Sequence, residues 1–180
     1  MTSILEVEQL DTLSSNASST LTIGGTNTTT IAFGPNVTTT PSSLANTPAF
    51  HAYRTASQTI STGAWTKIEI NVELFDSDSN FDATTNYRFT PTTSGKYYIY
   101  GSVNNGVYNV AQYVGIYKNG SQELLAQANS DGGSIVNVSG TVDFNGSTDY
   151  VELYTYVTTS STSTQGQERT FFGGYKIIGA

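Results

Sequence analysis

The chain has 180 residues and a mass of 19.2 kDa, which suits one domain with a short extension. Only 12% of its residues are charged, and the net charge of −7 argues against a nucleic-acid partner or an anionic membrane surface. The lack of cysteine excludes disulfides and thiolate zinc sites, and no apolar run approaches the roughly 20 residues of a membrane span.

The first thirteen residues fit two secondary structures. Ile4, Val7 and Leu10 have helical spacing, whereas Leu5, Val7 and Gln9 alternate as in a strand. The pattern leaves both structures open.

Residues 14–47 carry no charged side chain and are rich in Thr and Asn. Within them, residues 21–30 and 31–40 repeat one pattern of two apolar positions, a following glycine and three closing threonines. Such a unit forms a short strand whose apolar face it cannot bury alone, so copies have to stack. We therefore predict an extended β-repeat shaft built from several chains around one axis. A flexible linker is the alternative.

Residues 48–180 are dense in strand patterns separated by turn signals. Residues 67–74 alternate polar and apolar, which predicts that Ile68, Ile70, Val72 and Leu74 share one buried face. Further strands are expected at residues 97–103, 113–117, 140–144, 150–157 and 171–178, with Asn-Gly turns at residues 119–120 and 145–146. The prediction is all-β: an antiparallel jelly-roll β-sandwich of about eight to ten strands, preceded by the shaft.

Several of these segments resemble a known family. Residues 49–54, 65–68, 80–91, 95–99, 114–120 and 172–177 look like strands and loops of the complement-one-q globular-head family, which belongs with the tumour-necrosis-factor-like jelly rolls. The resemblance spans residues 48–180 and implies a knob that assembles as a homotrimer. Asn86 stands where the family usually has Gly, and Asn also tolerates a left-handed turn.

The N-terminal part carries a second resemblance. Residues 3–7 followed by the Thr/Asn repeats look like fibre proteins of tailed phages. That resemblance implies that residues 1–13 anchor the chain to a capsid or tail protein, so that the protein lies at the virion surface. Together the two resemblances imply an anchor at 1–13, a shaft at 14–47 and a knob at 48–180.

The sequence offers little for catalysis. A Ser/His/Asp triad would have to use His51, the single histidine, which sits in the first expected strand of the knob. The carboxylates are scattered over turns and polar strand faces, which favours a role in solubility. We therefore predict that the protein is not an enzyme and needs no cofactor.

One acidic loop is a candidate calcium site. Four oxygen-bearing side chains stand at alternate positions: Asp76, Asp78, Asn80 and Asp82. The calcium-loop template requires Gly at its sixth position and Glu at its twelfth, where this chain has Phe81 and Tyr87. A loop-fixing role is the prediction, and bound calcium is the alternative because some members of the resembled family carry it.

Two sets of residues are candidates for contacts with partners. Tyrosine buries its ring and keeps a hydrogen-bonding hydroxyl, so strand tyrosines suit a trimer seam, with a sugar-stacking receptor site as the rival interpretation. The predicted seam residues are Tyr98, Tyr100, Tyr113 and Tyr117. The predicted receptor-binding residues lie in two polar loops: Asn105, Tyr108, Asn109, Gln165 and Gln167.

The function predicted from these features is that of a homotrimeric viral (phage) fibre or decoration protein. Its knob would attach the virion to a host-surface glycan or protein, with avidity from several weak sites. The alternatives are a purely structural trimerisation or capping protein of the virion, and a bacterial surface or spore-coat protein with the same head.

Overall fold

The computed structural model describes residues 46–107, 110–130, 135–159, 161–163, 166 and 169–178. The predicted anchor and the predicted shaft up to residue 45 lie outside these residues. The described residues form strands, turns and loops, and none of them belongs to a helix that could cross a membrane.

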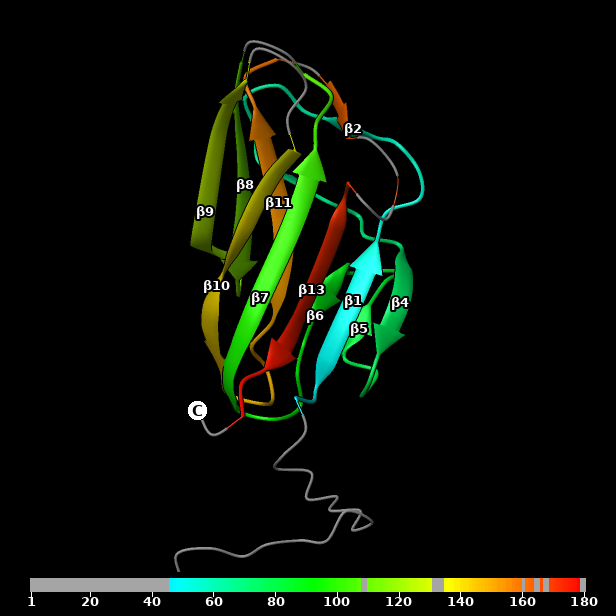
Figure 1. Ribbon diagram of the computed structural model, residues 1–180, viewed down its shortest axis with the longest axis vertical. Coiled ribbons are helices and arrows are strands. Elements are labelled where there is room, and N and C mark those ends of the chain that lie inside the picture. Colours follow the sequence, from blue (N-terminus) through cyan, green and yellow to red (C-terminus); the bar gives the residue numbers. More distant parts are fainter. Residues whose placement is uncertain are drawn as a thin grey trace, which may run out of the picture. The chain divides into compact units, whose positions relative to one another are not determined.

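One layer of the fold is a five-stranded antiparallel sheet that faces the viewer in Figure 1. Its strands lie in the order β10-β7-β13-β1-β4. Their bounds are β1 Ala49–Tyr53, β4 Val72–Asp76, β7 Gly95–Asn104, β10 Ile135–Phe144 and β13 Phe171–Lys176. The first and last long strands of the knob are therefore neighbours, as β1 pairs with β13.

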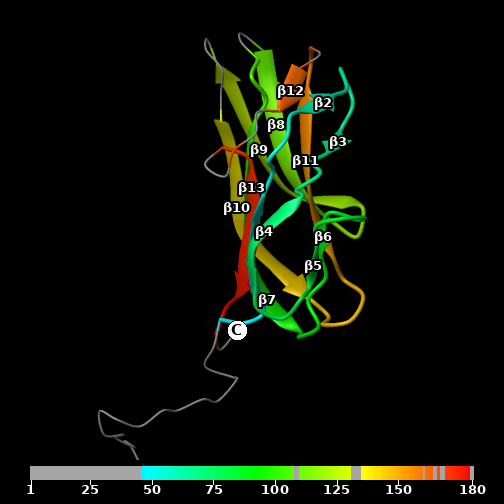
Figure 2. The ribbon, with the colours of Figure 1, turned by 90° about the vertical axis from the view of Figure 1, so that its right-hand side faces the viewer.

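The second layer is a six-stranded sheet in the order β5-β6-β11-β8-β9, with β3 also paired to β11. Its strands are β3 Thr66–Lys67, β5 Phe81–Asp82, β6 Arg88–Phe89, β8 Val110–Lys118, β9 Ser121–Ser130 and β11 Val151–Val157. A short pair, β2 Gln58–Ile60 and β12 Ser161–Ser163, lies beside it. Figure 2 shows the two layers edge-on, with β13 in one and β11 in the other. The predicted all-β sandwich is confirmed, but the described residues form thirteen strands and not eight to ten, because several are only two or three residues long.

The core lies between the two sheets and is built largely from aromatic rings. Phe50 of β1 stacks on Phe89 of β6 with ring centroids 4.2 Å apart, and it meets Phe172 of β13 edge-on at 5.2 Å. Tyr97 and Ile99 of β7 are fully buried as well. Each such side chain contributes roughly 1.5–3 kcal/mol through burial, so this aromatic cluster holds the sheets together.

The predicted buried face of residues 67–74 is confirmed for two of its four apolar side chains. Ile68 and Ile70 are fully buried, but Val72 is half-buried and Leu74 is 55% exposed. The chain leaves the six-stranded sheet after Lys67 and enters the five-stranded sheet at Val72, with a tight turn between them in which the Ile70 amide donates to the Ile68 carbonyl. The alternation therefore does not run through one continuous strand, because the chain crosses from one layer to the other.

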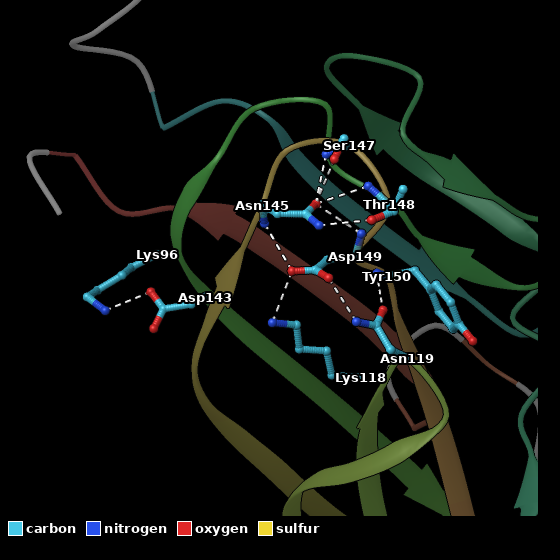
Figure 3. A network of polar contacts seen from close by, with 9 residues as sticks. All are labelled: Lys96, Lys118, Asn119, Asp143, Asn145, Ser147, Thr148, Asp149 and Tyr150. Atoms are coloured by element: carbon cyan, nitrogen blue, oxygen red, sulfur yellow. Dashed lines mark hydrogen bonds and ion pairs between the residues drawn. The ribbon is translucent and has the colours of Figure 1, made fainter.

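A polar network fixes two loops at one end of the sandwich (Figure 3). The Asp149 carboxylate accepts hydrogen bonds from Asn119 Nδ2 at 2.8 Å and from the Asn145 amide at 3.0 Å, and it pairs with Lys118 Nζ at 3.1 Å. Bonds from Asn119 and Lys118 lower the pKa of Asp149. The predicted Asn119–Gly120 turn between β8 and β9 is present, with φ of 51° and 79°. The Asp149 carboxylate thus links the two loops at this end of the domain.

Candidate functional site

The outer surface of the five-stranded sheet carries a continuous group of rings, here called the aromatic face. It consists of His51, Phe75, Tyr98, Tyr100, Phe171 and Tyr175. The register explains how the rings meet: His51 of β1, Gly173 of β13 and Tyr100 of β7 lie side by side in one row. Because Gly173 has no side chain, the Tyr100 ring crosses over β13 and its hydroxyl reaches His51 Nδ1 at 3.0 Å.

The aromatic face is electrically neutral and partly exposed. Burial lowers the pKa of His51, which favours the uncharged imidazole at neutral pH. Burial raises the pKa of Tyr100, with a further contribution from Tyr175. Phe75 is 49% exposed and Tyr175 is 38% exposed. An uncharged aromatic surface of this kind is typical of a face that another protein surface covers.

A second group of rings lies on the outer surface of the six-stranded sheet. Trp65 sits with its ring centroid 6.5 Å from that of Tyr113, 5.5 Å from that of Tyr117 and 5.7 Å from that of Tyr156. Tyr117 in turn packs on Tyr154 at 4.4 Å. Trp65 and Tyr156 were not predicted as site residues. The single tryptophan of the chain and the tyrosines at alternate positions of the strands were the signals that could have indicated them.

The four predicted seam tyrosines do not share one surface. Tyr98 and Tyr100 belong to the aromatic face, whereas Tyr113 and Tyr117 point outward from the opposite layer. The alternation within each strand correctly separated inward from outward residues. It carried no information on which sheet a strand joins, so the predicted seam is divided into two separate surfaces.

The rings of the second group border a hollow of about 380 Å³. It is lined by Trp65, Tyr113, Leu125, Tyr156 and Thr158, and is here called the tryptophan hollow. None of these described lining residues is charged.

The predicted receptor residues fall in different places. Asn105 is fully buried, and its side-chain amide donates to Thr155 Oγ1 at 2.8 Å and to Gln112 Oε1 at 3.4 Å. The assignment of Asn105 to a receptor surface is therefore wrong, because its polar group holds strands together inside the sandwich. The other four residues, Tyr108, Asn109, Gln165 and Gln167, lie outside the described residues.

In the acidic loop, the side-chain oxygens accept hydrogen bonds from nearby groups of the protein. Asp82 accepts hydrogen bonds from the amides of Thr84 and Thr85, and chiefly these bonds hold its pKa well below the usual range. Asp76 accepts from the Phe81 amide at 2.7 Å, and Asn80 accepts from the Thr92 amide at 2.8 Å. Asp78 hydrogen-bonds the neighbouring Ser77. Within the described part of the chain, no group of three or more acidic or histidine side chains is placed to hold a metal ion.

In the connection between β5 and β6, the left-handed residue is not the expected one. Tyr87 has a φ of 51°, whereas the φ of Asn86 is not positive. Asn86 instead donates a hydrogen bond from its side-chain Nδ2 to Asp82 Oδ2 at 2.7 Å. The expectation that Asn86 itself takes the left-handed turn is therefore corrected. Its side chain is used to close the loop onto Asp82.

Comparison with known proteins identifies the fold. No protein-family model matches the sequence, and no curated protein matches it either. The structure is similar to that of murine APRIL at pH 5.0, with a TM-score of 0.55 and 12% identity over 72% of this chain and 98% of that one. It is similar to the globular domain of zebrafish complement 1qA, with a TM-score of 0.52 and 15% identity over 72% and 97%. The Eiger TNF of S. frugiperda gives a TM-score of 0.56 and 12% identity over 73% and 93%. The knob therefore has the jelly-roll fold of TNF-like and complement-one-q head proteins.

Proposed function

We propose that the protein is the homotrimeric knob of a virion fibre or decoration protein, which attaches the particle to a glycan or protein on the host surface. The aromatic face is the observation that carries this proposal. It supplies an uncharged, partly exposed surface of six rings for contact with a second copy of the chain. The number three follows from the resemblance of residues 48–180 to a family of homotrimers.

An exposed apolar residue at the edge of the aromatic face strengthens the argument for self-association. Phe75, in the edge strand β4, is 49% exposed. Covering the exposed half of its side chain contributes on the order of 1 kcal/mol per subunit. Repeated around a closed ring of subunits, this gain favours assembly through this face.

Assembly through the aromatic face leaves the outer surface of the six-stranded sheet for the host. In this proposal residues 1–13 attach the chain to a capsid or tail protein, and the knob acts by binding and not by catalysis. Multiple knobs on one particle would then combine weak single contacts into stable attachment.

Light scattering of the full chain tests the assembly. We expect a solution mass near three times 19.2 kDa. Phe75→Glu, which places a charge in the proposed interface, should lower the mass toward that of one chain. Leu125→Glu is the matched control, since Leu125 is also 49% exposed but lies on the opposite layer, and this variant should keep the wild-type mass. A monomeric wild-type chain, or equal effects of the two variants, would contradict the proposed interface.

The virion role needs a separate test. A chain lacking residues 1–13 should still form the trimer but should not enter particles. Particles assembled without the knob should lose host adsorption, whereas a purely structural cap would leave adsorption unchanged and weaken the particle instead.

A further inference from the structure

We propose that the tryptophan hollow binds one ring of an uncharged saccharide. This inference rests on the proposed attachment function and names the ligand class that the knob would recognise. Three features of the described residues support it: the shape of the hollow, polar atoms that no described residue hydrogen-bonds, and an uncharged lining.

A glycine lies under Trp65 at one side of the hollow. In the six-stranded sheet, Leu125 of β9, Gly115 of β8 and Tyr154 of β11 lie in one row. Trp65 lies over Gly115, where an added Cβ would stand 3.5 Å from Trp65 Cη2 and 3.1 Å from Tyr117 Cε2. A Cβ alone would make ordinary contact with the indole and crowd the Tyr117 ring, whereas a longer side chain at this position would run into Trp65. The small residue therefore leaves room for the indole beside the rings that border the hollow.

The rings are inclined to one another and border an open, shallow hollow. Trp65 and Tyr156 are inclined by 49° at 5.7 Å, and Tyr113 and Tyr156 by 75° at the same distance. Leu125, 49% exposed, adds an aliphatic side to the hollow. A volume of about 380 Å³ lies at the lower end of the roughly 300–1,000 Å³ typical of small-molecule sites, which suits one or two sugar rings.

Three polar atoms at the hollow have no hydrogen-bond partner among the described residues. No described residue hydrogen-bonds the hydroxyls of Tyr113 and Tyr156 or the indole N–H of Trp65. The exposed Thr158 brings a further hydroxyl. A sugar ring has an apolar C–H face that packs on aromatic rings and a rim of hydroxyls that bonds such groups, so it matches both features at once. A lipid chain would leave the polar atoms unused.

The charges around the hollow favour a neutral ligand. Glu152, a buried carboxylate of this layer, is paired with Lys67 at 2.8 Å and also accepts from the Tyr154 hydroxyl at 3.3 Å. The lining itself is uncharged and the chain as a whole carries −7. An acidic sugar such as a sialic acid would therefore find no cation in the hollow and would be repelled by the protein at longer range.

Fluorescence of Trp65 tests the proposal directly, because Trp65 is the only tryptophan in the chain. The full chain is titrated with the methyl pyranosides of glucose, galactose, mannose and N-acetylglucosamine, and with N-acetylneuraminic acid. We expect a saturable change in emission with at least one neutral pyranoside and none with the acidic sugar. A response to N-acetylneuraminic acid alone, or to no probe, would overturn the proposal.

Variants locate the binding. Tyr156→Phe removes only a hydroxyl and should weaken binding about three- to tenfold, while Tyr156→Ala should abolish it. Asp143→Ala, in β10 of the opposite sheet, is the control and should bind sugar as the wild type does, because its side chain is 70% exposed. Equal loss in Asp143→Ala and Tyr156→Ala would place the ligand elsewhere or report a general loss of folding, and would overturn the assignment.

The same samples separate this inference from the proposed function. A chain of trimeric mass that shows no sugar response would refute the saccharide site and leave the trimeric knob standing. A monomeric chain that binds sugar with loss in Tyr156→Ala would refute the assembly and keep the site.

Discussion

His51 Nδ1 and the Tyr100 hydroxyl lie 3.0 Å apart across a strand to which neither belongs. The contact exists because Gly173, in the strand between them, leaves room for the Tyr100 ring. One glycine thus sets how the rings of the aromatic face interlock, and with it the shape of the surface that we propose as the subunit interface.

The first prediction concerns Gly173. Gly173→Ala should lower the free energy of unfolding by about 1–3 kcal/mol, because the new Cβ would collide with the Tyr100 ring. Urea unfolding at a fixed protomer concentration measures this. In a Tyr100→Ala background the same substitution should have little effect, since the colliding ring is gone. Equal losses in both backgrounds would show that the two residues are not coupled.

The second prediction is a pH dependence through His51. Burial lowers the pKa of folded His51 below the 6.5 of an exposed histidine, so below pH 6.5 the unfolded chain binds more protons than the folded one. The free energy of unfolding should therefore fall as the pH drops below about 6.5, by at most about 1.4 kcal/mol per pH unit for this one group. His51→Gln should remove this slope between pH 5 and 7. An unchanged slope in the variant would assign the effect to other groups.

The third prediction compares two aspartates in Figure 3. Asp149, whose side chain is 14% exposed, accepts bonds from three residues, and hydrogen bonds to a charged group are the stronger kind, so Asp149→Ala should lower the free energy of unfolding by about 1–3 kcal/mol. Asp143 forms a comparably short ion pair with Lys96 at 2.7 Å, but its side chain is 70% exposed. Asp143→Ala should therefore lower the free energy of unfolding by less than about 1 kcal/mol. Thermal unfolding of the two variants measures the difference, and similar losses would contradict the role given to Asp149.

The fourth prediction concerns calcium. The oxygens of Asp76 and Asp82 are occupied by backbone amides of their own loop, so the unfolding midpoint should be the same in excess EDTA and in millimolar calcium. Binding to the folded state alone would raise the midpoint with calcium concentration. Asp82→Ala, by contrast, should lower the midpoint in both buffers. A calcium-dependent rise that Asp82→Ala removes would restore the calcium alternative.

Local patterns in the sequence predicted much of the fold. Alternation placed Tyr97 and Ile99 on one face of their strand and Tyr98 and Tyr100 on the other, and both pairs lie as expected. The Asn-Gly pair at residues 119–120 predicted the β8–β9 hairpin. Both signals act between near neighbours in the chain, where the period of a strand and the φ angles of a turn are properties of the residues themselves.

The candidate sites depended on pairings over long distances in the chain. The tryptophan hollow requires Trp65, Tyr113 and Tyr156 to meet, and the aromatic face requires His51 and Tyr100 to share a row. Asn105 lies in a polar stretch, yet it is buried, and its side-chain NH2 group donates to Thr155 and Gln112 inside the sandwich.

The sequence by itself determined the strand pattern, the turns and the all-β class of this protein. Only the tertiary structure decided which strands are neighbours, and therefore which tyrosines line the proposed interface and which line the hollow. The physical reason is that a period of two specifies the face of a strand but not its partner. The partner is selected by packing of the whole core, in which every strand competes for its place.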